Sequence, residues 1–264
     1  MKKLIAVAAA IAAVGFIGSA SAADMPLKAV GAPLDPGYNW TGWYVGANAG
    51  AHMSRDNDSA TDSSDANFIP GNIVLLNQAA PFNLTQSGFA GGGHIGYNWQ
   101  SSNFVYGLEA DFDALTGTVT RNLIQPIIVD TVQFTDSAKD NWMSTARARA
   151  GFAFNQFLIF GTAGLAVSNW QRNHTFAQIA GGGTTNGATS QTVTRAGWAV
   201  GGGVEYALIN NWSIRGEYLH ADFRTVSSSL TSTQGGAFPT VFSHSEKLTE
   251  DVVRGGISYK FSSR

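Results

Sequence analysis

Apolar and polar residues alternate along eight segments of the chain. In the first segment, Trp43, Val45 and Ala47 fall on one side, and Asn48 and His52 fall on the other. Alternation with a period of two is the pattern of a β-strand with one apolar and one polar face. The strands predicted in this way span about 42–53, 88–100, 104–114, 142–154, 157–168, 195–207, 212–223 and 250–261. Both faces of 157–168 are apolar, so the pattern leaves the register of that strand open.

The connections between these strands alternate between short and long. The short ones are tight turns at 101–103, 155–156 and 209–211. The long ones span about 54–87, 115–141, 169–194 and 224–249. An even number of strands returns both chain ends to the side of the short turns, and short periplasmic turns with longer external loops are typical of outer-membrane barrels. We therefore predict an all-β fold, an eight-stranded antiparallel transmembrane up-and-down β-barrel with long extracellular loops and short periplasmic turns.

Aromatic residues cluster at the strand ends beside the short turns. Aromatic rings favour the lipid head-group level, where an apolar body and a polar edge are both satisfied. The predicted periplasmic girdle consists of Trp40, Trp43, Tyr97, Trp99, Phe104, Tyr106, Phe157, Tyr206, Trp212, Tyr259 and Phe261. A thinner girdle at the opposite end is predicted from Phe112, Trp142, Trp170, Trp198 and Phe223. A soluble β-sandwich or lipocalin-like barrel is the alternative, but it gives no reason for aromatic residues to gather beside the same turns.

The polar faces of the strands carry charges of both signs. The predicted inward-facing acids are Glu109, Asp111, Asp113, Glu205 and Glu217, and the bases are Arg147, Arg149, Arg195, Arg215, Arg254 and Lys260. Unpaired charges are costly in a barrel so narrow that side chains fill it, so this near-balance predicts a network of ion pairs that closes the lumen. The alternative is that Arg147 and Arg149 with Glu109 and Glu217 gate a narrow, low-conductance channel. A wide pore needs about 16 strands.

The first residues predict export. Two lysines precede an apolar run from Leu4 to Ile17, and 20–22 read Ala-Ser-Ala, the small-x-small pattern of a cleavage site. The run is short of the ~20 residues that a membrane-spanning helix needs. The predicted organisation is a signal peptide at 1–22, a proline-containing periplasmic tail at 23–39 and an outer-membrane barrel domain at 40–264. The predicted location is the cell outer membrane.

Composition agrees with a barrel and limits the chemistry. The chain has 31 glycines, 11% aromatic and 13% charged residues, no cysteine and a net charge of −2. Its mean hydropathy of −0.02 fits strands with one face in lipid, whereas a helical membrane protein shows long hydrophobic blocks. The lack of cysteine excludes disulfides and thiolate metal sites. Nothing in the charge balance indicates a nucleic-acid partner.

The remaining residues are weaker candidates for a ligand-binding, metal or catalytic site. His52 and His94 fall on inward faces, and His220 and His244 near the external rim, where lone histidines are usually polar wall residues. The acidic residues of the first long connection, Asp56, Asp58, Asp62 and Asp65, lack the glycine and bidentate glutamate of a calcium loop. Serine, histidine and acid nowhere show a recognisable catalytic spacing. We therefore predict no enzyme activity, no cofactor and no metal.

Several motifs occur in a family order. They lie at 38–46 (YNWTGWYVG), 142–151 (WMSTARARAG), 197–206 (GWAVGGGVEY) and 211–219 (NWSIRGEYL). These motifs resemble the small outer-membrane immunogenic protein family of α-proteobacteria. The resemblance covers the strands and none of the long connections. It departs at the end, because barrel assembly usually reads an aromatic terminal residue and here Phe261 is followed by Ser-Ser-Arg.

The resemblance implies a small integral surface protein of Gram-negative bacteria, porin-like in architecture. We predict a structural, surface-exposed envelope protein with a closed lumen, whose partners are outer-membrane lipid, lipopolysaccharide and the barrel-assembly machinery. The alternatives are a narrow ion or small-solute channel, and binding of a ligand such as haem or of a host surface through the external loops.

Overall fold

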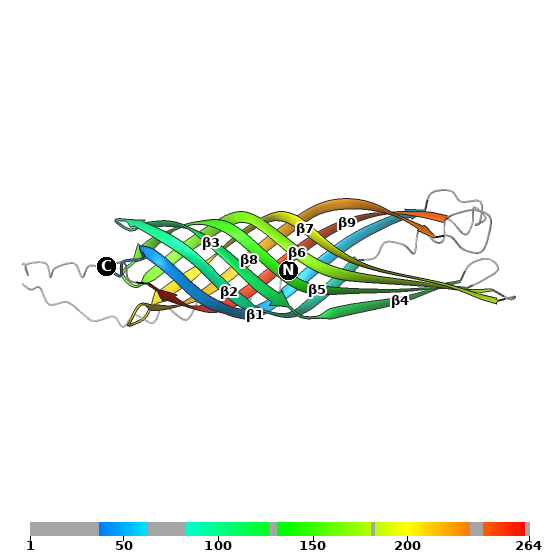
Figure 1. Cartoon of the computed structure of the whole chain (residues 1–264), viewed down its shortest axis with the longest axis horizontal. Coiled ribbons are helices and arrows are strands. Elements are labelled where there is room, and N and C mark those ends of the chain that lie inside the picture. Colours follow the sequence, from blue (N-terminus) through cyan, green and yellow to red (C-terminus); the bar gives the residue numbers. More distant parts are fainter. Residues whose placement is uncertain (1–36, 63–82, 127–130, 181–182, 233–239, 262–264) are drawn as a thin grey trace, which may run out of the picture. The chain divides into compact units, whose positions relative to one another are not determined.

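The computed structural model describes residues 37–62, 83–126, 131–180, 183–232 and 240–261 (Figure 1). The predicted signal peptide and nearly all of the predicted tail lie outside the described residues. The strands are β1 (Gly42–Asp62), β2 (Asn83–Ser101), β3 (Phe104–Leu115), β4 (Thr118–Pro126), β5 (Thr131–Phe154), β6 (Phe157–Ala180), β7 (Gly183–Ala207), β8 (Trp212–Ser232) and β9 (Thr240–Lys260). Within these ranges, no helix is long and apolar enough to cross a membrane.

The strands form a closed antiparallel ring. Neighbours pair in the order β3-β2-β1-β9-β8-β7-β6-β5-β4, and β3 also pairs with β5. Along β5, β3 pairs with 142–152 and β4 with 131–139, so β3 and β4 together occupy one position in the ring. The break between them lies at Thr116 and Gly117, where Gly117 has a φ of 126°. The ring therefore has eight positions and confirms the predicted eight-stranded barrel.

The strands extend well beyond their predicted ends. Each of the four long connections contains paired β-structure; for example, β6 and β7 pair continuously from Phe157↔Tyr206 to Ala180↔Gly183. The predicted strands end too early because these extensions, such as 183–194, are rich in Gly, Ser, Thr and Asn, and show no apolar alternation. Backbone pairing needs no apolar face and continues without one. The described parts of the long connections are therefore arms of β-hairpins, and we call this end of the barrel the hairpin end (Figure 1).

The short turns are those that the sequence predicts. They lie at 101–103, 155–156 and 209–211, and their residues include Ser102, Asn155, Asn210 and Asn211, all with positive φ between 54° and 67°. Asparagine tolerates this left-handed conformation better than other residues with a side chain. We call this the short-turn end.

The outer face of the barrel is apolar and the strand alternation is as predicted. In β1, Trp43 is 56% exposed whereas Tyr44 is 4% exposed. In β6, the strand whose register the pattern left open, Phe157 and Ile159 point outward, and Leu158 and Phe160 are buried inside. The exposed apolar face of each strand fits contact with lipid rather than water.

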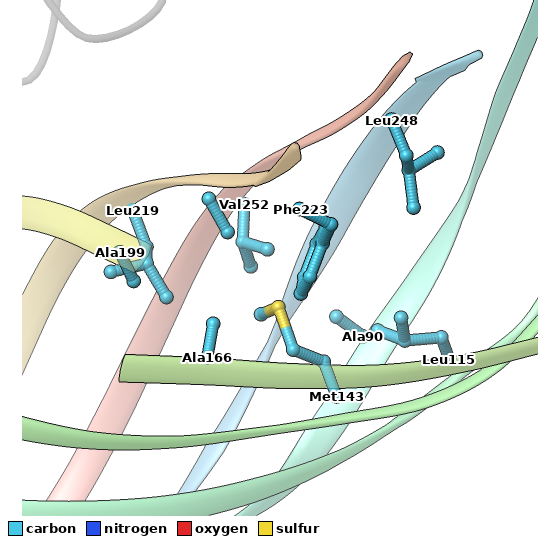
Figure 2. Packing of buried hydrophobic residues seen from close by; sticks show 10 residues of the cluster. Ala90, Leu115, Met143, Ala166, Ala199, Leu219, Phe223, Leu248 and Val252 are labelled. Carbon is cyan, nitrogen blue, oxygen red and sulfur yellow. The ribbon is translucent and has the colours of Figure 1, made fainter. Parts of the chain in front are cut away.

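Apolar residues also fill the barrel interior at two levels, which the sequence analysis did not predict. One cluster lies toward the short turns: Trp40, Val105, Ala153, Leu158, Phe160 and Ala207, with Tyr38 packed against it. The outer cluster lies nearer the hairpin end (Figure 2): Ala90, Leu115, Met143, Ala166, Ala199, Leu219, Ala221, Phe223, Leu248 and Val252, with Trp170 against it.

These clusters correct three girdle predictions. Trp40 is 2% exposed and lies inside the barrel at the short-turn end, because it precedes the first strand and packs against Val105 and Leu158. Phe223 is 1% exposed and Trp170 packs against the outer cluster, since both fall on inward-facing positions of their strands. Rings of the periplasmic girdle that point outward do contact one another, as in Trp99–Tyr106 and Trp212–Tyr259.

Candidate functional site

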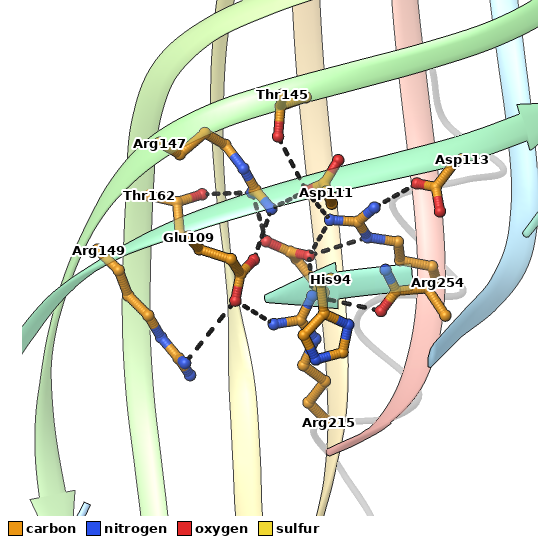
Figure 3. Close-up of polar contacts among 12 residues, drawn as sticks. His94, Glu109, Asp111, Asp113, Thr145, Arg147, Arg149, Thr162, Arg215 and Arg254 are labelled. Atoms are coloured by element: carbon orange, nitrogen blue, oxygen red, sulfur yellow. Dashed lines mark hydrogen bonds and ion pairs between the residues drawn. The ribbon is translucent and has the colours of Figure 1, made fainter. Parts of the chain in front are cut away.

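A network of buried charges occupies the middle of the barrel, between the two apolar clusters (Figure 3). Arg147 on β5 lies at its centre. Its Nη2 donates to Glu109 Oε1 at 2.8 Å and to Asp111 Oδ2 at 2.7 Å, and its Nη1 donates to Glu217 Oε1 at 2.5 Å. The side chain of Arg147 is fully buried, so three carboxylates compensate one guanidinium away from water.

The other arginines extend the network around the ring. Arg254 on β9 donates to Glu217 Oε2 and Asp111 Oδ2, both at 2.8 Å, and also to Asp113. Its guanidinium therefore links β9 to carboxylates on β3 and β8. The planar guanidinium presents several donors in a fixed fork, which suits contact with two or more carboxylates better than a lysine ammonium.

Arg215 and Arg149 complete the network toward the short turns. Arg215 donates to Glu109 Oε2, and Arg149 donates to Glu205 and lies 4.0 Å from the ring of Phe160. The network thus ends directly against the apolar cluster at the short-turn end.

The structure brings together nine of the eleven predicted lumen residues. These are Glu109, Asp111, Asp113, Arg147, Arg149, Glu205, Arg215, Glu217 and Arg254. The sequence located them because each lies on the polar face of a strand that spans the membrane. Their partners could not be read from the sequence, since β3 meets β5 directly but meets β8 and β9 only across the lumen.

Two predicted members lie elsewhere, which corrects their assignment to the central network. Arg195 lies toward the hairpin end with its guanidinium 4.9 Å from the centre of the Trp170 ring. Lys260 is the last residue of β9 and donates to the backbone oxygen of Asn39. Both face inward as predicted, but each is too far along its strand to reach the central acids.

The tail contributes to the short-turn end. Lys260 Nζ lies 4.5 Å from the ring centre of Tyr38, whose ring packs edge-on against Trp40 at 4.8 Å. Burial raises the pKa of Tyr38 to about 12, with the Glu205 carboxylate adding to the shift. Tyr38 and Trp40, just before β1, are therefore packed parts of the barrel.

A second polar cluster, which we call the outer triad, consists of His52 on β1, Asp140 on β5 and Glu250 on β9. The sequence analysis identified only His52, as a wall residue. Asp140 was missed because a β-bulge falls between Asp140 and Trp142, so Asp140 points inward although a regular strand would place it on the outward face with Trp142. Glu250 was missed because it lies at the edge of the predicted strand.

The predicted acidic loop is also corrected. Asp56 is part of β1, is 8% exposed and forms an ion pair with Arg172 at 2.5 Å. Side chains of Asp58, Asp62 and Asp65, and that of His244, lie outside the described part of the chain. His94 bonds Ser258 Oγ at 2.8 Å, as a polar wall residue does.

Comparison with known proteins decides the family. The sequence-family model called outer membrane protein beta-barrel domain matches residues 9–261. The chain belongs to this family. It is 32% identical over 263 residues to the 31 kDa outer-membrane immunogenic protein of Brucella melitensis, covering 96% of this chain and 98% of the relative. It is 28% identical over 230 residues to the 22 kDa outer membrane protein of Rhizobium leguminosarum, covering 87% and 82%.

Solved structures with similar folds share little sequence. Neisserial surface protein A has 14% identity and a TM-score of 0.37, covering 84% of this chain and 98% of that chain. Ail, the attachment invasion locus protein of Yersinia pestis, has 13% identity and a TM-score of 0.33, covering 83% and 99%. The family and the named relatives together confirm the resemblance read from the motifs. They also show that this β-barrel is an outer-membrane protein, with its short turns on the periplasmic side by the general rule for such barrels.

Proposed function

We propose that this protein is a structural, surface-exposed component of the envelope, a barrel with a closed lumen that carries long β-hairpins outside the membrane. The observation that carries the proposal is the layered interior. An apolar cluster, a charged network and a second apolar cluster follow one another along the barrel axis. An ion on this path would have to displace buried hydrocarbon twice and separate buried ion pairs once.

Bilayer conductance tests this proposal. The refolded full-length chain inserted into planar lipid bilayers should give no steady conductance steps, while a wide general porin inserted in the same way serves as the positive control. Insertion is checked independently by protease protection of the barrel in the same lipid. Steady nanosiemens-scale steps from the inserted chain would show that the lumen is open.

A narrow channel is the second candidate, and one observation favours it. Arg147 contacts three carboxylates and Arg215 contacts Glu109 and, at 3.5 Å, Glu217, so alternative pairings are available without exposing a charge. If such exchange opens a path, Arg147→Gln and Glu109→Gln should change a small single-channel current. Currents that are identical in both variants and the parent would remove the gate from consideration.

In this proposal the hairpins are the part of the protein that is exposed on the cell surface. The Brucella relative is named an immunogenic protein, which describes that protein, and for this chain we propose accessibility from outside the cell. Outer-membrane lipid and lipopolysaccharide are the proposed neighbours of the apolar belt, and the barrel-assembly machinery is the proposed partner during insertion. Protease treatment of intact cells should cleave within the hairpins and leave the barrel; full protection of the hairpins would contradict the surface role. The proposal includes no enzymatic activity.

A further inference from the structure

The outer triad joins three strands inside the barrel, beside the outer apolar cluster. His52, Asp140 and Glu250 are 2%, 2% and 1% exposed, and one ligand-type atom from each lies within 4.8 Å of the others. His52 Nδ1 is 2.5 Å from Glu250 Oε1 and 3.8 Å from Asp140 Oδ2. One imidazole and two carboxylates thus converge on one point that is screened from solvent.

Hydrogen bonding fixes the orientation of the imidazole. His52 Nε2 lies 2.7 Å from the backbone oxygen of Thr116, and a carbonyl oxygen can only accept, so Nε2 carries a proton. In the neutral ring, Nδ1 is then an acceptor that faces two carboxylate oxygens. Three acceptor atoms directed at one another require a cation or an additional proton between them. A ring N–H bonded to a backbone carbonyl is also the usual arrangement behind a metal-binding histidine.

Gln86 on β2 supplies a second and independent indication. Its side chain is buried, and its Nε2 donates to Asp140 Oδ2 at 3.1 Å and to the Gly117 oxygen at 3.0 Å. Among the described residues, Gln86 Oε1 and Glu250 Oε2 are buried and have no hydrogen-bond partner. A buried oxygen without a partner is costly, and both of these oxygens belong to side chains that contact the outer triad, where a cation would satisfy them.

The apolar surroundings of the outer triad raise the free energy of its two ionised carboxylates. Leu248 and Val252 flank Glu250 along β9, and both belong to the outer apolar cluster. In the described ranges, the ion-pair partner of both carboxylates is His52, and no arginine or lysine lies within 4.0 Å of them. With a neutral imidazole the triad carries two negative charges in an apolar environment, which a divalent cation would cancel.

We propose that the outer triad binds one divalent transition-metal ion of the zinc class, through His52 Nδ1 and one oxygen each of Asp140 and Glu250. Mixed imidazole and carboxylate ligands suit such ions better than calcium or magnesium, which prefer oxygen alone. Bonds of about 2.0–2.2 Å in a tetrahedral site separate ligand atoms by about 3.3 Å, so Nδ1 and Oε1, 2.5 Å apart here, move apart by about 0.8 Å when the ion enters. A water molecule, or Gln86 with its amide turned so that Oε1 replaces Nε2, completes the shell, and the ion ties β1, β5 and β9 together near the hairpin end.

Metal analysis of the refolded full-length protein tests the site. The chain is refolded into detergent with Zn²⁺ present, because the site is buried, and is then dialysed against zinc-free buffer containing excess Mg²⁺. We expect one zinc per chain in the parent, and at least about a tenfold lower content in His52→Gln and Glu250→Gln. His220→Gln is the matched control, since His220 lies on another strand and bonds Asp251 instead; it should retain the zinc.

A measurement on the parent alone keeps the test independent of variant folding. X-ray absorption at the zinc edge should show a nitrogen and oxygen shell with one imidazole. The proposal is wrong if the parent retains no zinc, if His52→Gln and Glu250→Gln retain as much as the parent, or if the bound zinc has no imidazole ligand. The first result would mean that an extra proton, and not a metal, holds the outer triad together.

Discussion

At the residue scale, both apolar and charged side chains are buried inside the barrel, and each has contacts that match its chemistry. The interior holds the ring of Phe160 4.0 Å from the guanidinium of Arg149, and both side chains are buried. Arginine supplies all the bases of the central network, where a single guanidinium reaches two or three acids. A buried charge in such a place is stable only while its partners remain, so a single neutralisation has a large cost.

Glu217→Gln tests that dependence. Glu217 accepts hydrogen bonds from Arg147 and Arg254 and lies 3.5 Å from Arg215. Its neutralisation therefore removes a compensating negative charge from three buried guanidinium groups. We expect the free energy of unfolding to fall by about 3–5 kcal/mol, measured by urea titration of the protein in lipid vesicles.

The control for that variant is Asp222→Asn. Asp222 pairs with the half-exposed Lys247 at 3.3 Å, and an exposed pair contributes at most about 1 kcal/mol. Equal losses of stability in the two variants would show that the central network is no more important than a surface ion pair.

At the element scale, irregular positions in the strands decide where side chains point. The bulge after Asp140 turns that carboxylate inward, and the break at Thr116 and Gly117 directs two backbone oxygens to His52 and Gln86. Glycines act in the same way by permitting close approach of neighbouring strands. A Cβ on Gly92 would lie 1.8 Å from the backbone oxygen of Phe112 on β3.

Gly92→Ala should therefore be poorly tolerated. The added methyl group meets backbone, which cannot move aside as a flexible side chain can, so we expect a loss of about 1–3 kcal/mol or failure to refold. Gly216→Ala is the matched control, because nothing lies within 4 Å of its added Cβ. Urea midpoints and the refolded yield of both variants provide the measurement, and similar behaviour of the two would contradict the close-packing argument.

At the scale of the whole molecule, the barrel and its hairpins are held together by different forces. Around the membrane-spanning part, every strand has lipid on one side and the packed interior on the other. The hairpin extensions are joined by backbone pairing, as between β6 and β7 out to Ala180↔Gly183. The barrel should consequently keep its stability when an extension is shortened.

Deletion of 174–189 tests this separation. Asn173 and Ser190 are paired residues, so an Asn-Gly turn can join them without changing the register. We expect the free energy of unfolding of the shortened protein, measured by urea titration, to stay within about 1 kcal/mol of the parent, since neither apolar cluster and no ion pair of the central network includes a residue of 174–189. A larger loss would show that the hairpins help to hold the barrel closed.

The strand order, the inward or outward direction of most residues in the regular strands, the short turns and the family motifs could be predicted from the sequence. These properties are local: lipid on one side of every strand imposes alternation, and a tight turn needs residues such as Asn155 that accept positive φ.

What only the tertiary structure decided is which inward residues meet. Arg147 finds Glu217 across the lumen because the ring closes, and not because of any spacing in the chain. Trp40 lies inside the barrel because it packs against Val105 and Leu158, and Asp140 joins His52 because one bulge reverses its direction. Contacts between distant segments depend on closure and register, which alternation alone does not encode.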